Sequence, residues 1–433
     1  MKRIALILLF GAFAIPLPAQ EAWPLDRCVQ YALEHNPGIR EKEVEVEIRQ
    51  AELTQKRLAH LPVISAQVVQ EYNWGRSVDM QELVIIRNAL TRATGATVSA
   101  SLPLFDGLSR HYQRLSAGKA VEVAALESAD LRTELETDVT RAYLELMLAK
   151  QILSYTRESL ATIVKQRDRT TRLVEAGSQP KSALSEMEAQ VAAEKAEMVA
   201  AECRVRTATL SLTRLMNLPG HVPFTTGDRF GQDSVVVRVS LLSDTQTEDC
   251  LVRDPRIRGA QARIAQLQHE HSAVKGGFLP SLALSAGYGT YYSSTADQPF
   301  KTQIDENRNP SLSLQLTIPI FDTWQTATRL KKSRLALEMA RLDAEKLRSQ
   351  LLGEIRSAGI EAENCFQQYL SSEETLQAMQ NLLEITEAKY NLGAATALDY
   401  IVARNNRFKA VSDYLQAKWQ YLFQLKLLER YRP

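Results

Sequence analysis

The chain has 433 residues, of which 45% are hydrophobic and 24% charged, and its 52 Lys and Arg residues are balanced by 51 Asp and Glu residues. This composition excludes a disordered chain, and a net charge of +1 lacks the positive field that a nucleic-acid partner requires. The low numbers of glycines and prolines, 18 and 15, favour a mainly helical protein.

The N-terminus, residues 1–19, is predicted to be a secretory signal peptide. Lys2 and Arg3 precede an apolar run from Ile4 to Ile15, and Pro16-Leu17-Pro18-Ala19 follows. The alternative is a single membrane anchor, but the run is shorter than the roughly 20 residues that a spanning helix needs. We therefore expect the mature protein to act outside the cytoplasm.

Residues of the kinds that bind metals or catalyse reactions are scattered along the chain. Cys28, Cys203, Cys250 and Cys365 lie too far apart for a zinc or thiol-redox motif, so we expect structural cysteines and leave their disulfide pairing open. The six histidines lack metalloprotease spacing, and the sequence contains neither a phosphate-binding loop nor a nucleophile elbow. We predict a protein that is not an enzyme, with no catalytic residue, metal or cofactor.

The two halves of the chain repeat one plan. Four landmarks of the first half recur in the same order in the second, at a nearly constant separation along the sequence, which predicts an internal duplication. We divide the mature chain into a first repeat, 20–216, a linker, 217–244, and a second repeat, 245–433. The landmarks, each given with its counterpart in the second half, are Asn36-Pro37 with Asp254-Pro255; Leu61-Pro62 with Leu279-Pro280; Leu102-Pro103-Leu104-Phe105-Asp106 with Ile318-Pro319-Ile320-Phe321-Asp322; and Gly177 with Gly393.

Each repeat begins with a helix and continues with two strands of alternating polarity. In the first repeat we expect one helix over 25–59 and a β-hairpin over 61–105, with a polar loop over 75–94 between its strands. The second repeat has its β-hairpin over 279–321. One face of every strand is small or polar and the other is apolar. The apolar faces carry Ile64, Ala66, Val68, Tyr72 and Trp74; Ala96, Val98, Ala100, Leu102 and Leu104; Leu282, Leu284, Ala286, Tyr288 and Tyr292; and Leu312, Leu314, Leu316, Ile318 and Ile320.

A long α-hairpin follows each β-hairpin, over 106–216 and over 322–431. The first helix of each α-hairpin runs for roughly 70 residues without proline, which is about 100 Å of helix. Apolar residues spaced three and four apart, such as Leu131, Leu135 and Val139, predict a continuous seam between neighbouring helices. We expect the chain to turn back at Gly177 and at Gly393.

The four strands fit transmembrane β-strands, with tyrosine and tryptophan gathered toward one end. The alternative is two ordinary hairpins on a soluble core. Open strand edges are costly in lipid, so spanning strands must close into a barrel, and four strands are too few. Two copies would supply eight strands and three copies twelve, and the small polar residues of the inner face favour the wider, water-filled barrel. The sequence thus predicts a mainly α-helical fold with transmembrane β-strands, whose homotrimer forms a 12-stranded β-barrel in lipid, continued by a cylinder of helices.

The chain resembles the TolC-type outer-membrane efflux proteins over almost its whole mature length. The resemblance rests on the duplicated order of helix, Leu-Pro strand, second strand and Phe-Asp junction, and on Lys389-Tyr390-Asn391-Leu392-Gly393 followed by Asp399 and Ala403. It implies a homotrimeric channel with an outer-membrane β-barrel and a periplasmic α-barrel, in a Gram-negative-type bacterium. It also implies two partners, a periplasmic adaptor protein and an inner-membrane pump, which we expect to be proton-driven. Small toxic molecules or, in some members, proteins leave the cell through such channels.

The resemblance further implies a gate near the hairpin turns, which tyrosine, arginine and acidic side chains hold shut in the family. Tyr390 and Asp399 fall on matching positions, whereas Ala395 stands in the place of the arginine, and Val402 and Ala183 stand in acidic places. The alternative role of Tyr390 is packing in the helix seam, and that of Asp399 is a charge in a first helical turn. The turns themselves match the tips that contact the adaptor: Gly177, Ser178, Gln179 and Pro180, and Gly393, Ala394, Ala395 and Thr396.

Two other classes of protein fit parts of the sequence. An exported coiled-coil scaffold or tether without transport activity would account for the helices alone. A passive porin would account for the strands but gives no reason for helices of about 100 Å. The channel hypothesis accounts for both, and leaves the transported substrate open.

Overall fold

The computed structural model describes residues 22–78, 84–220, 224–227 and 243–431. The predicted signal peptide lies outside these residues. Within them, no helix has the length and apolar character that crossing a membrane would require.

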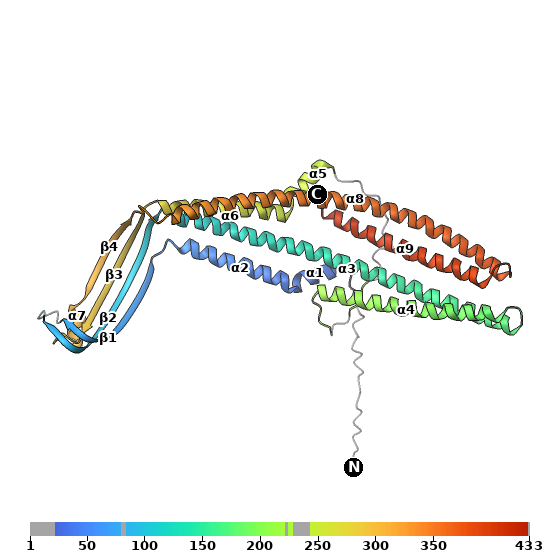
Figure 1. The fold of residues 1–433 in the computed structure, drawn as a ribbon, viewed down its shortest axis with the longest axis horizontal. Helices are drawn as coiled ribbons and strands as arrows, with labels where there is room; N and C mark the ends of the chain where they lie inside the picture. Colours follow the sequence, from blue (N-terminus) through green and yellow to red (C-terminus); the bar gives the residue numbers. More distant parts are fainter. Residues whose placement is uncertain (1–21, 79–83, 221–223, 228–242, 432–433) are drawn as a thin grey trace, which may run out of the picture. The chain divides into compact units, whose positions relative to one another are not determined.

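The two repeats contain the same long elements in the same order (Figure 1). The first repeat contains α1 (Leu25–His35), α2 (Pro37–Leu58), β1 (Val63–Val78), β2 (Ile85–Asp106), α3 (Ser109–Glu175) and α4 (Lys181–Leu215). The second contains α5 (Asp244–Arg253), α6 (Pro255–Lys275), the 3₁₀-helix η1 (Gly276–Phe278), β3 (Ser281–Ser293), α7 (Phe300–Glu306), β4 (Asn309–Thr317), α8 (Gln325–Asn391) and α9 (Ala397–Glu429).

The expected single helix over 25–59 is broken in two between His35 and Pro37. Asn36 takes an extended conformation, with φ −73° and ψ 123°, because a proline disfavours the helical conformation of the residue before it. The side chain of Asn36 then accepts a hydrogen bond from the backbone N–H of Gly38 at 2.8 Å, which caps α2.

The polar loop that we expected over 75–94 is also wrong, because β1 extends to Val78 and β2 already begins at Ile85. Tyr72 pairs with Arg92 and Trp74 with Leu90 in this part of the hairpin. Backbone ladders form without regard to side-chain polarity, so the loss of alternation in the sequence did not mark the end of the strands. At the other end of the sheet, β4 stops at Thr317 rather than at Ile320, just before Pro319, which has no N–H to donate.

The chain divides into two units, and each takes residues from both repeats. The helical unit comprises Met1–Glu41, Asp130–Leu251 and Leu351–Pro433, and the sheet unit comprises Lys42–Ala129 and Val252–Gln350.

The sheet unit contains one antiparallel sheet with the strand order β1-β2-β3-β4 (Figure 1). The middle pair, β2 and β3, joins the two repeats, and β1 and β4 are its edges. One row of paired residues runs across all four strands as Ile64, Ala100, Ala286 and Leu312, so the four predicted apolar faces form one continuous apolar face. The next row is Ser65, Ser99, Gly287 and Ser311, and it belongs to the opposite, polar face.

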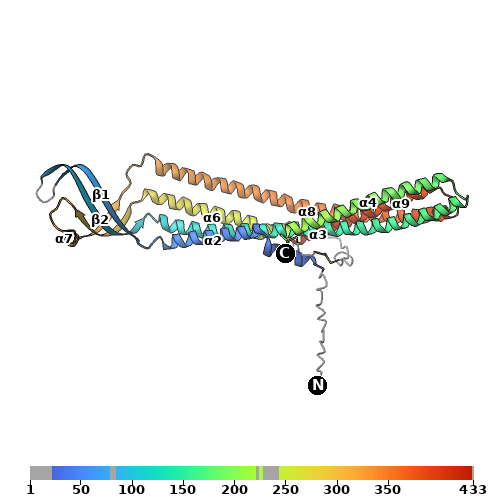
Figure 2. The same cartoon turned by 90° about the horizontal axis from the view of Figure 1, so that it is seen from below.

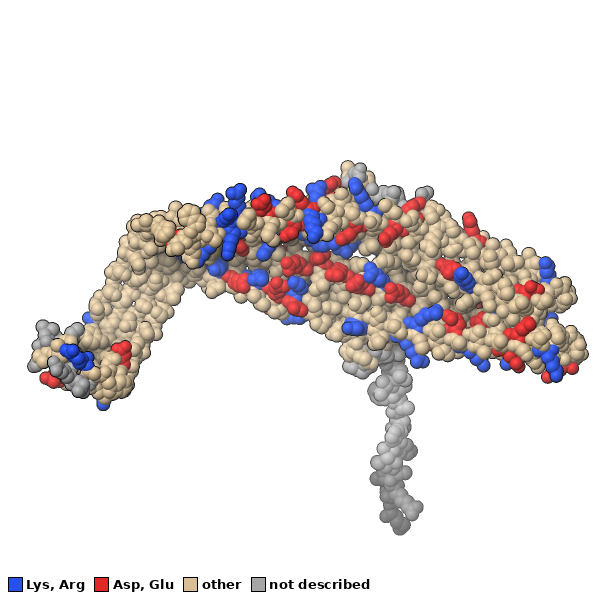
Figure 3. Space-filling model, viewed as in Figure 1, with Lys and Arg blue, Asp and Glu red and all other residues tan. Residues whose placement is uncertain are grey.

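The apolar face is uncovered in a single copy of the chain. Val68 on β1 is 75% exposed and Leu312 on β4 is 76% exposed. On the side seen in Figure 3, charged side chains are dense over the helices and nearly absent over the strands. The predicted alternative, hairpins that pack on a soluble core, does not fit this exposure.

An aspartate lies just before the long helix of each repeat. The side-chain oxygen Oδ2 of Asp106 accepts from the backbone N–H of Arg110 at 3.1 Å, and that of Asp322 accepts from the N–H of Thr326 at 2.7 Å. The two residues after each aspartate have positive φ, 66° and 65° in the first repeat and 53° and 67° in the second. The repeated Phe-Asp pair therefore marks a sharp turn from strand to helix, with the aspartate as the helix cap.

The helical unit contains α4 and α9 together with residues 130–175 of α3 and 351–391 of α8, so each α-hairpin turns back within this unit (Figures 1 and 2). Val139 and Leu146 of the predicted seam are buried, and they pack in one cluster with Leu212 of α4 and Leu415 of α9. Cys28 lies in the same cluster, where burial raises the pKa of its thiol to about 12. Among the described residues, which include all four cysteines, no disulfide is formed.

Candidate functional site

The turns of the two α-hairpins have the same backbone geometry. Gly177 and Gly393 have φ values of 72° and 74°, which a residue with a Cβ adopts only with strain. The N–H of Gly177 donates to the carbonyl of Val174 at 3.0 Å, and that of Ser178 donates to Leu173 at 2.8 Å. Gly393 and Ala394 repeat both bonds in the second hairpin at 3.1 and 2.8 Å. Each glycine thus ends a long helix and reverses the chain.

The returning helices begin differently. Pro180 precedes α4 without a side-chain cap. Thr396 and Asp399 form a capping box at α9: the Thr396 hydroxyl accepts from the N–H of Asp399 at 3.2 Å, and Asp399 Oδ2 accepts from the N–H of Thr396 at 3.0 Å. The Thr396 hydroxyl and N–H hold the pKa of Asp399 below its ordinary value. In a single copy, the carboxylate of this predicted gate residue serves the helix start, and its gate role stays a prediction.

Tyr390 is buried between the two hairpins of one copy. Its ring stacks on Tyr400 with 5.3 Å between centroids and 16° between planes, and its hydroxyl lies 3.3 Å from Thr170 Oγ1 on α3. Ala183, which stands in an acidic place of the family, is buried in the same cluster, and Ala395, in the place of the arginine, packs against it. The packing role that we gave as an alternative for Tyr390 is thus present in one copy, and its gate role stays a prediction.

A buried charged pair, not predicted from the sequence, lies between the hairpins. Arg404 Nη1 of α9 lies 3.2 Å from Glu194 Oε1 of α4, and these side chains are only 7% and 6% exposed. Arg404 Nη2 also donates to the carbonyl and the hydroxyl of Ser159 on α3. The sequence did contain a sign of this pair, because Glu194 continues the buried row of Met187 and Val191 along α4. A charged residue on an apolar stripe indicates a buried partner.

The tips of the hairpins are open to solvent. Gly177, Ser178, Gly393 and Ala394 are exposed, and Leu392 beside them is 85% exposed. Behind the tips, Arg169 Nη1 donates to Asn391 Oδ1 at 2.5 Å, and Gln190 Nε2 donates to Asn405 Oδ1 at 3.1 Å. These bonds tie one hairpin to the other, so both tips form part of one packed end of the helical unit.

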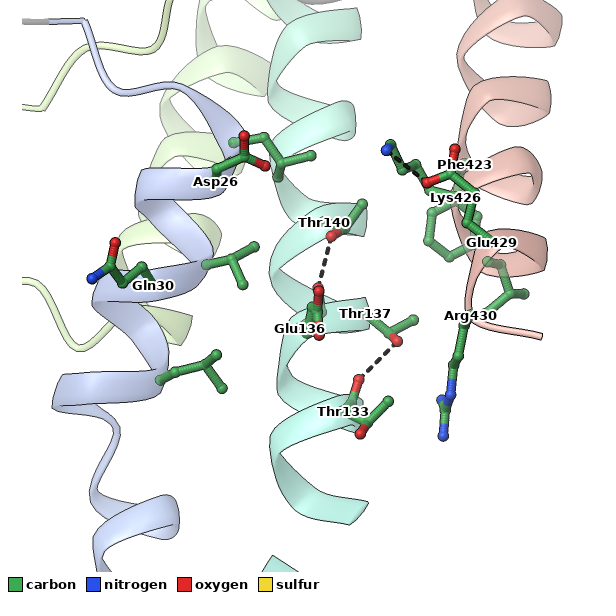
Figure 4. A pocket seen from close by; sticks show the side chains of 14 residues that line it. Asp26, Gln30, Thr133, Glu136, Thr137, Thr140, Phe423, Lys426, Glu429 and Arg430 are labelled. Atoms are coloured by element: carbon green, nitrogen blue, oxygen red, sulfur yellow. Dashed lines mark hydrogen bonds and ion pairs between the residues drawn. The ribbon is translucent and has the colours of Figure 1, made fainter. Parts of the chain in front are cut away.

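A groove of about 560 Å³ lies elsewhere in the helical unit, between α1, α3 and the end of α9 (Figure 4). Its threonine hydroxyls are used within α3: Thr137 donates to the carbonyl of Thr133 at 2.9 Å and Thr140 to that of Glu136 at 2.7 Å. Lys426 pairs with its neighbour Glu429 at 2.8 Å. The polar groups of this groove thus serve the helices rather than converge on a reacting atom. In the described part of the chain, no group of three His, Cys, Asp or Glu side chains could hold a metal ion.

Comparisons with known proteins add to this geometry. A model of the outer membrane efflux protein family matches residues 28–218 and 247–431. Outer membrane protein TolC of Vibrio cholerae is 22% identical over 332 residues, which are 74% of this chain and 73% of that protein. Alkaline protease secretion protein AprF of Pseudomonas aeruginosa is 24% identical over 439 residues, with 98% of this chain and 87% of AprF covered.

The fold is also found among solved structures. The crystal structure of the Campylobacter jejuni CmeC outer membrane channel matches with a TM-score of 0.78 at 16% sequence identity, over 94% of this chain and 85% of CmeC. This likeness confirms the predicted fold class, a mainly α-helical chain that also contains long β-strands.

Proposed function

Because the chain belongs to the outer membrane efflux protein family, we propose that three copies of it form the outer-membrane channel of a tripartite export system. Proteins of this family are outer-membrane channels rather than enzymes. The membership agrees with the outer-membrane location and the absence of enzymatic activity that the sequence predicts. The number of copies, the partners and the substrate are parts of the proposal.

The observation that carries the proposal is the open sheet with one apolar face. The apolar side chains of β1 to β4 align across both repeats, and within the described chain each edge strand, β1 or β4, is paired on one side only. In lipid, every unpaired backbone group at such an edge costs several kcal/mol, so the edges must be covered. Other copies of the same chain supply matching edges. Three copies give twelve strands, and the small polar residues of the other face then line a wet lumen.

The hairpin tips support docking of a periplasmic adaptor protein. They present exposed backbone and the exposed side chain of Leu392 on a scaffold of packed helices. Loop tips on a rigid scaffold are common contact sites, and an exposed leucine gains from burial against a partner. The adaptor would connect the channel to an inner-membrane pump, which we expect to be driven by protons.

An exported scaffold or tether is the weaker alternative. The helices would serve either function, but a scaffold in water would leave the apolar face of four strands exposed. The largest apolar patch on a typical soluble monomer is a few hundred Å². Leu312, Leu314, Leu316 and Val68 are each exposed by 60% or more, which favours contact with lipid.

We propose small toxic molecules as the substrates, and deletion of the gene tests this. The deletion strain is expected to become more sensitive to dyes, detergents, antibiotics or metal salts, and a plasmid copy of the gene should restore resistance. Unchanged sensitivity across the panel would contradict the efflux of small molecules. The similarity to AprF, which is named for protease secretion, makes the loss of a protein from the culture medium the alternative outcome.

A further inference from the structure

We propose that β4 of one copy pairs with β1 of the next in one particular register, with Leu316 directly opposite the partner subunit's Val68. The inference rests on the proposed function, which requires several copies to close the sheet. It goes further, because it states which residues meet. The described strands alone supply the register, through the internal duplication.

Two sequence offsets relate the strands of the two repeats. The Leu-Pro offset carries Leu61 to Leu279 and relates β1 to β3, and the Phe-Asp offset carries Phe105 to Phe321 and relates β2 to β4. Both offsets come from the landmarks of the duplication. Each residue of the shorter strands β3 and β4 therefore has an equivalent position on β1 or β2.

The two hairpins have the same internal register. Val63 pairs with Ser101 in the first hairpin, and Ser281 pairs with Thr317 in the second. The Leu-Pro offset carries Val63 to Ser281, and the Phe-Asp offset carries Ser101 to Thr317. The offsets found from the landmarks therefore reproduce the observed strand pairing. The duplication preserves pairing as well as sequence order.

The contact between the repeats supplies the template for the contact between copies. Within one chain, β2 of the first repeat pairs with β3 of the second, and Ala100 lies opposite Ala286. The Phe-Asp offset carries Ala100 to Leu316 on β4, and the Leu-Pro offset, applied in reverse, carries Ala286 to Val68 on β1. The same operation carries the observed pair Ala96 and Thr290 to Leu312 and the partner subunit's Tyr72.

The exposure of side chains at equivalent positions supports the transfer of the β2–β3 pairing to β4 and the β1 of the next copy. Phe105, next to β3 within the chain, is 41% exposed, whereas its equivalent Phe321, in the segment that follows the edge strand β4, is 78% exposed. Leu282 on β3 is half-buried, whereas its equivalent Ile64 on the open strand β1 is 68% exposed. Both differences have the sign expected if a neighbouring copy covers the edge as β2 and β3 cover each other.

The proposed register also matches the polarity of the two faces. Leu316 and Leu312 lie on the apolar face, as do Val68 and Tyr72. On the polar face, the observed pair is Thr97 and Gly289. The two offsets carry this pair to Ser313 and the partner subunit's Glu71, whose side chains are able to hydrogen-bond to each other. A slip of one residue would place apolar side chains of one strand on the polar face of the other, so the register is strongly specified.

The duplication is not perfect where strands meet helices. A Cβ on Gly107 would lie 2.4 Å from the carbonyl oxygen of Gly276, so the two backbones nearly touch inside the chain. The equivalents of these glycines are Thr323 and Leu58. Their side chains exclude such a close approach between copies, so we expect neighbouring copies to stand further apart at this level than the two repeats do.

Cysteine cross-linking tests the register in the full-length protein in outer-membrane vesicles. The test variant carries both Leu316→Cys and Val68→Cys in a Cys203→Ser background, which removes the exposed native thiol. The protein is oxidised, and its covalent species are then resolved on a denaturing gel without reductant. We expect covalent dimers and trimers that a reductant dissolves. Each single variant should stay at the size of one chain. In one copy β1 and β4 are three strand spacings apart, about 14 Å, which is beyond the reach of a disulfide.

Two further cysteine pairs serve as a positive and a negative control. Ala100→Cys with Ala286→Cys has the equivalent geometry inside one chain and should form a disulfide without increasing the mass. Leu316→Cys with Tyr72→Cys lies on the same face but is displaced by four residues, about 13 Å along the strand, and should not cross-link.

The outcomes separate the register from the proposed function. If copies associate in native mass measurements but a displaced pair cross-links better than Leu316→Cys with Val68→Cys, the register is overturned and the channel proposal stands. If the protein remains a single copy in detergent and in membranes, both are overturned.

Discussion

The buried pair of Arg404 and Glu194 joins the two α-hairpins close to their tips. Burial of two charges costs several kcal/mol in desolvation, which their attraction recovers only with good geometry and further hydrogen bonds. Here Glu194 Oε2 and Arg404 Nη1 lack a hydrogen-bond partner, although Nη1 lies within ion-pair distance of Glu194 Oε1. We therefore expect this pair to fix how the hairpins meet rather than to add much net stability.

Removal of one of these two charges is expected to be strongly destabilising. Glu194→Gln leaves the guanidinium of Arg404 buried without its counter-charge, which should cost about 3–5 kcal/mol. The double variant Glu194→Leu with Arg404→Met should recover most of this loss, because an apolar pair needs no solvation. Thermal unfolding in detergent, followed by circular dichroism of the helices, measures both effects.

The matched control is Glu202→Gln, which breaks the ion pair of Glu202 with Arg157 at 3.0 Å within the first hairpin. That pair is exposed, so its loss should cost less than about 1 kcal/mol. A Glu194→Gln variant that unfolds at the same temperature as Glu202→Gln would contradict the role given to the buried pair.

Individual contacts of this kind were the hardest to predict from the sequence. Glu194 and Arg404 belong to different repeats, and local spacing shows that each lies on a buried stripe but not that the two meet. The buried Tyr390 was easier, because the resemblance to a known family marked its position. The sequence left its packing partner Tyr400 unidentified, since ring stacking depends on how the helices are placed.

At the scale of elements, repeated patterns carried most of the information. The long helices α3 and α8 have 67 residues each, close to the roughly 70 expected, because a run without proline is a local property. The helix α7 was missed. Its buried residue Gln303 accepts from the N–H of Ser293 and donates to the carbonyl of Gln298. Contacts of this kind order the loop into a helix, and the polar sequence of the loop alone does not indicate them.

The tip of the second α-hairpin should tolerate change poorly. Gly393→Val places a β-branched residue at a φ of 74°, a conformation that costs roughly 1–2 kcal/mol or more and is expected to distort the turn. We expect this variant to insert and oligomerise normally but to restore resistance poorly in the deletion strain. Inhibitory concentrations and the amount of assembled protein are measured in parallel.

Gly353→Val is the control for this change. Gly353 lies inside α8, and a Cβ there would meet no atom of another helix or strand of the same chain within 4 Å. Full resistance with Gly393→Val would argue against the docking role of the tip. Loss of assembly in this variant would instead show that the turn is needed for folding.

For the whole molecule, the organisation of the sheet is the central feature. Sequence alternation predicted an apolar face on every strand, and the observed register joins these faces across the two repeats. The number of strands in one chain followed from the duplication. The number of copies is not encoded in any single segment, because closure depends on strand tilt and stagger in the complete barrel.

Electron cryo-microscopy of the protein extracted from outer membranes in detergent shows directly how many copies close the sheet. We predict three copies around one axis, with twelve strands closed into a barrel and β4 of each copy beside β1 of the next. A single copy whose own residues cover the apolar face of β1 to β4, or a closed barrel of eight strands from two copies, would contradict the account.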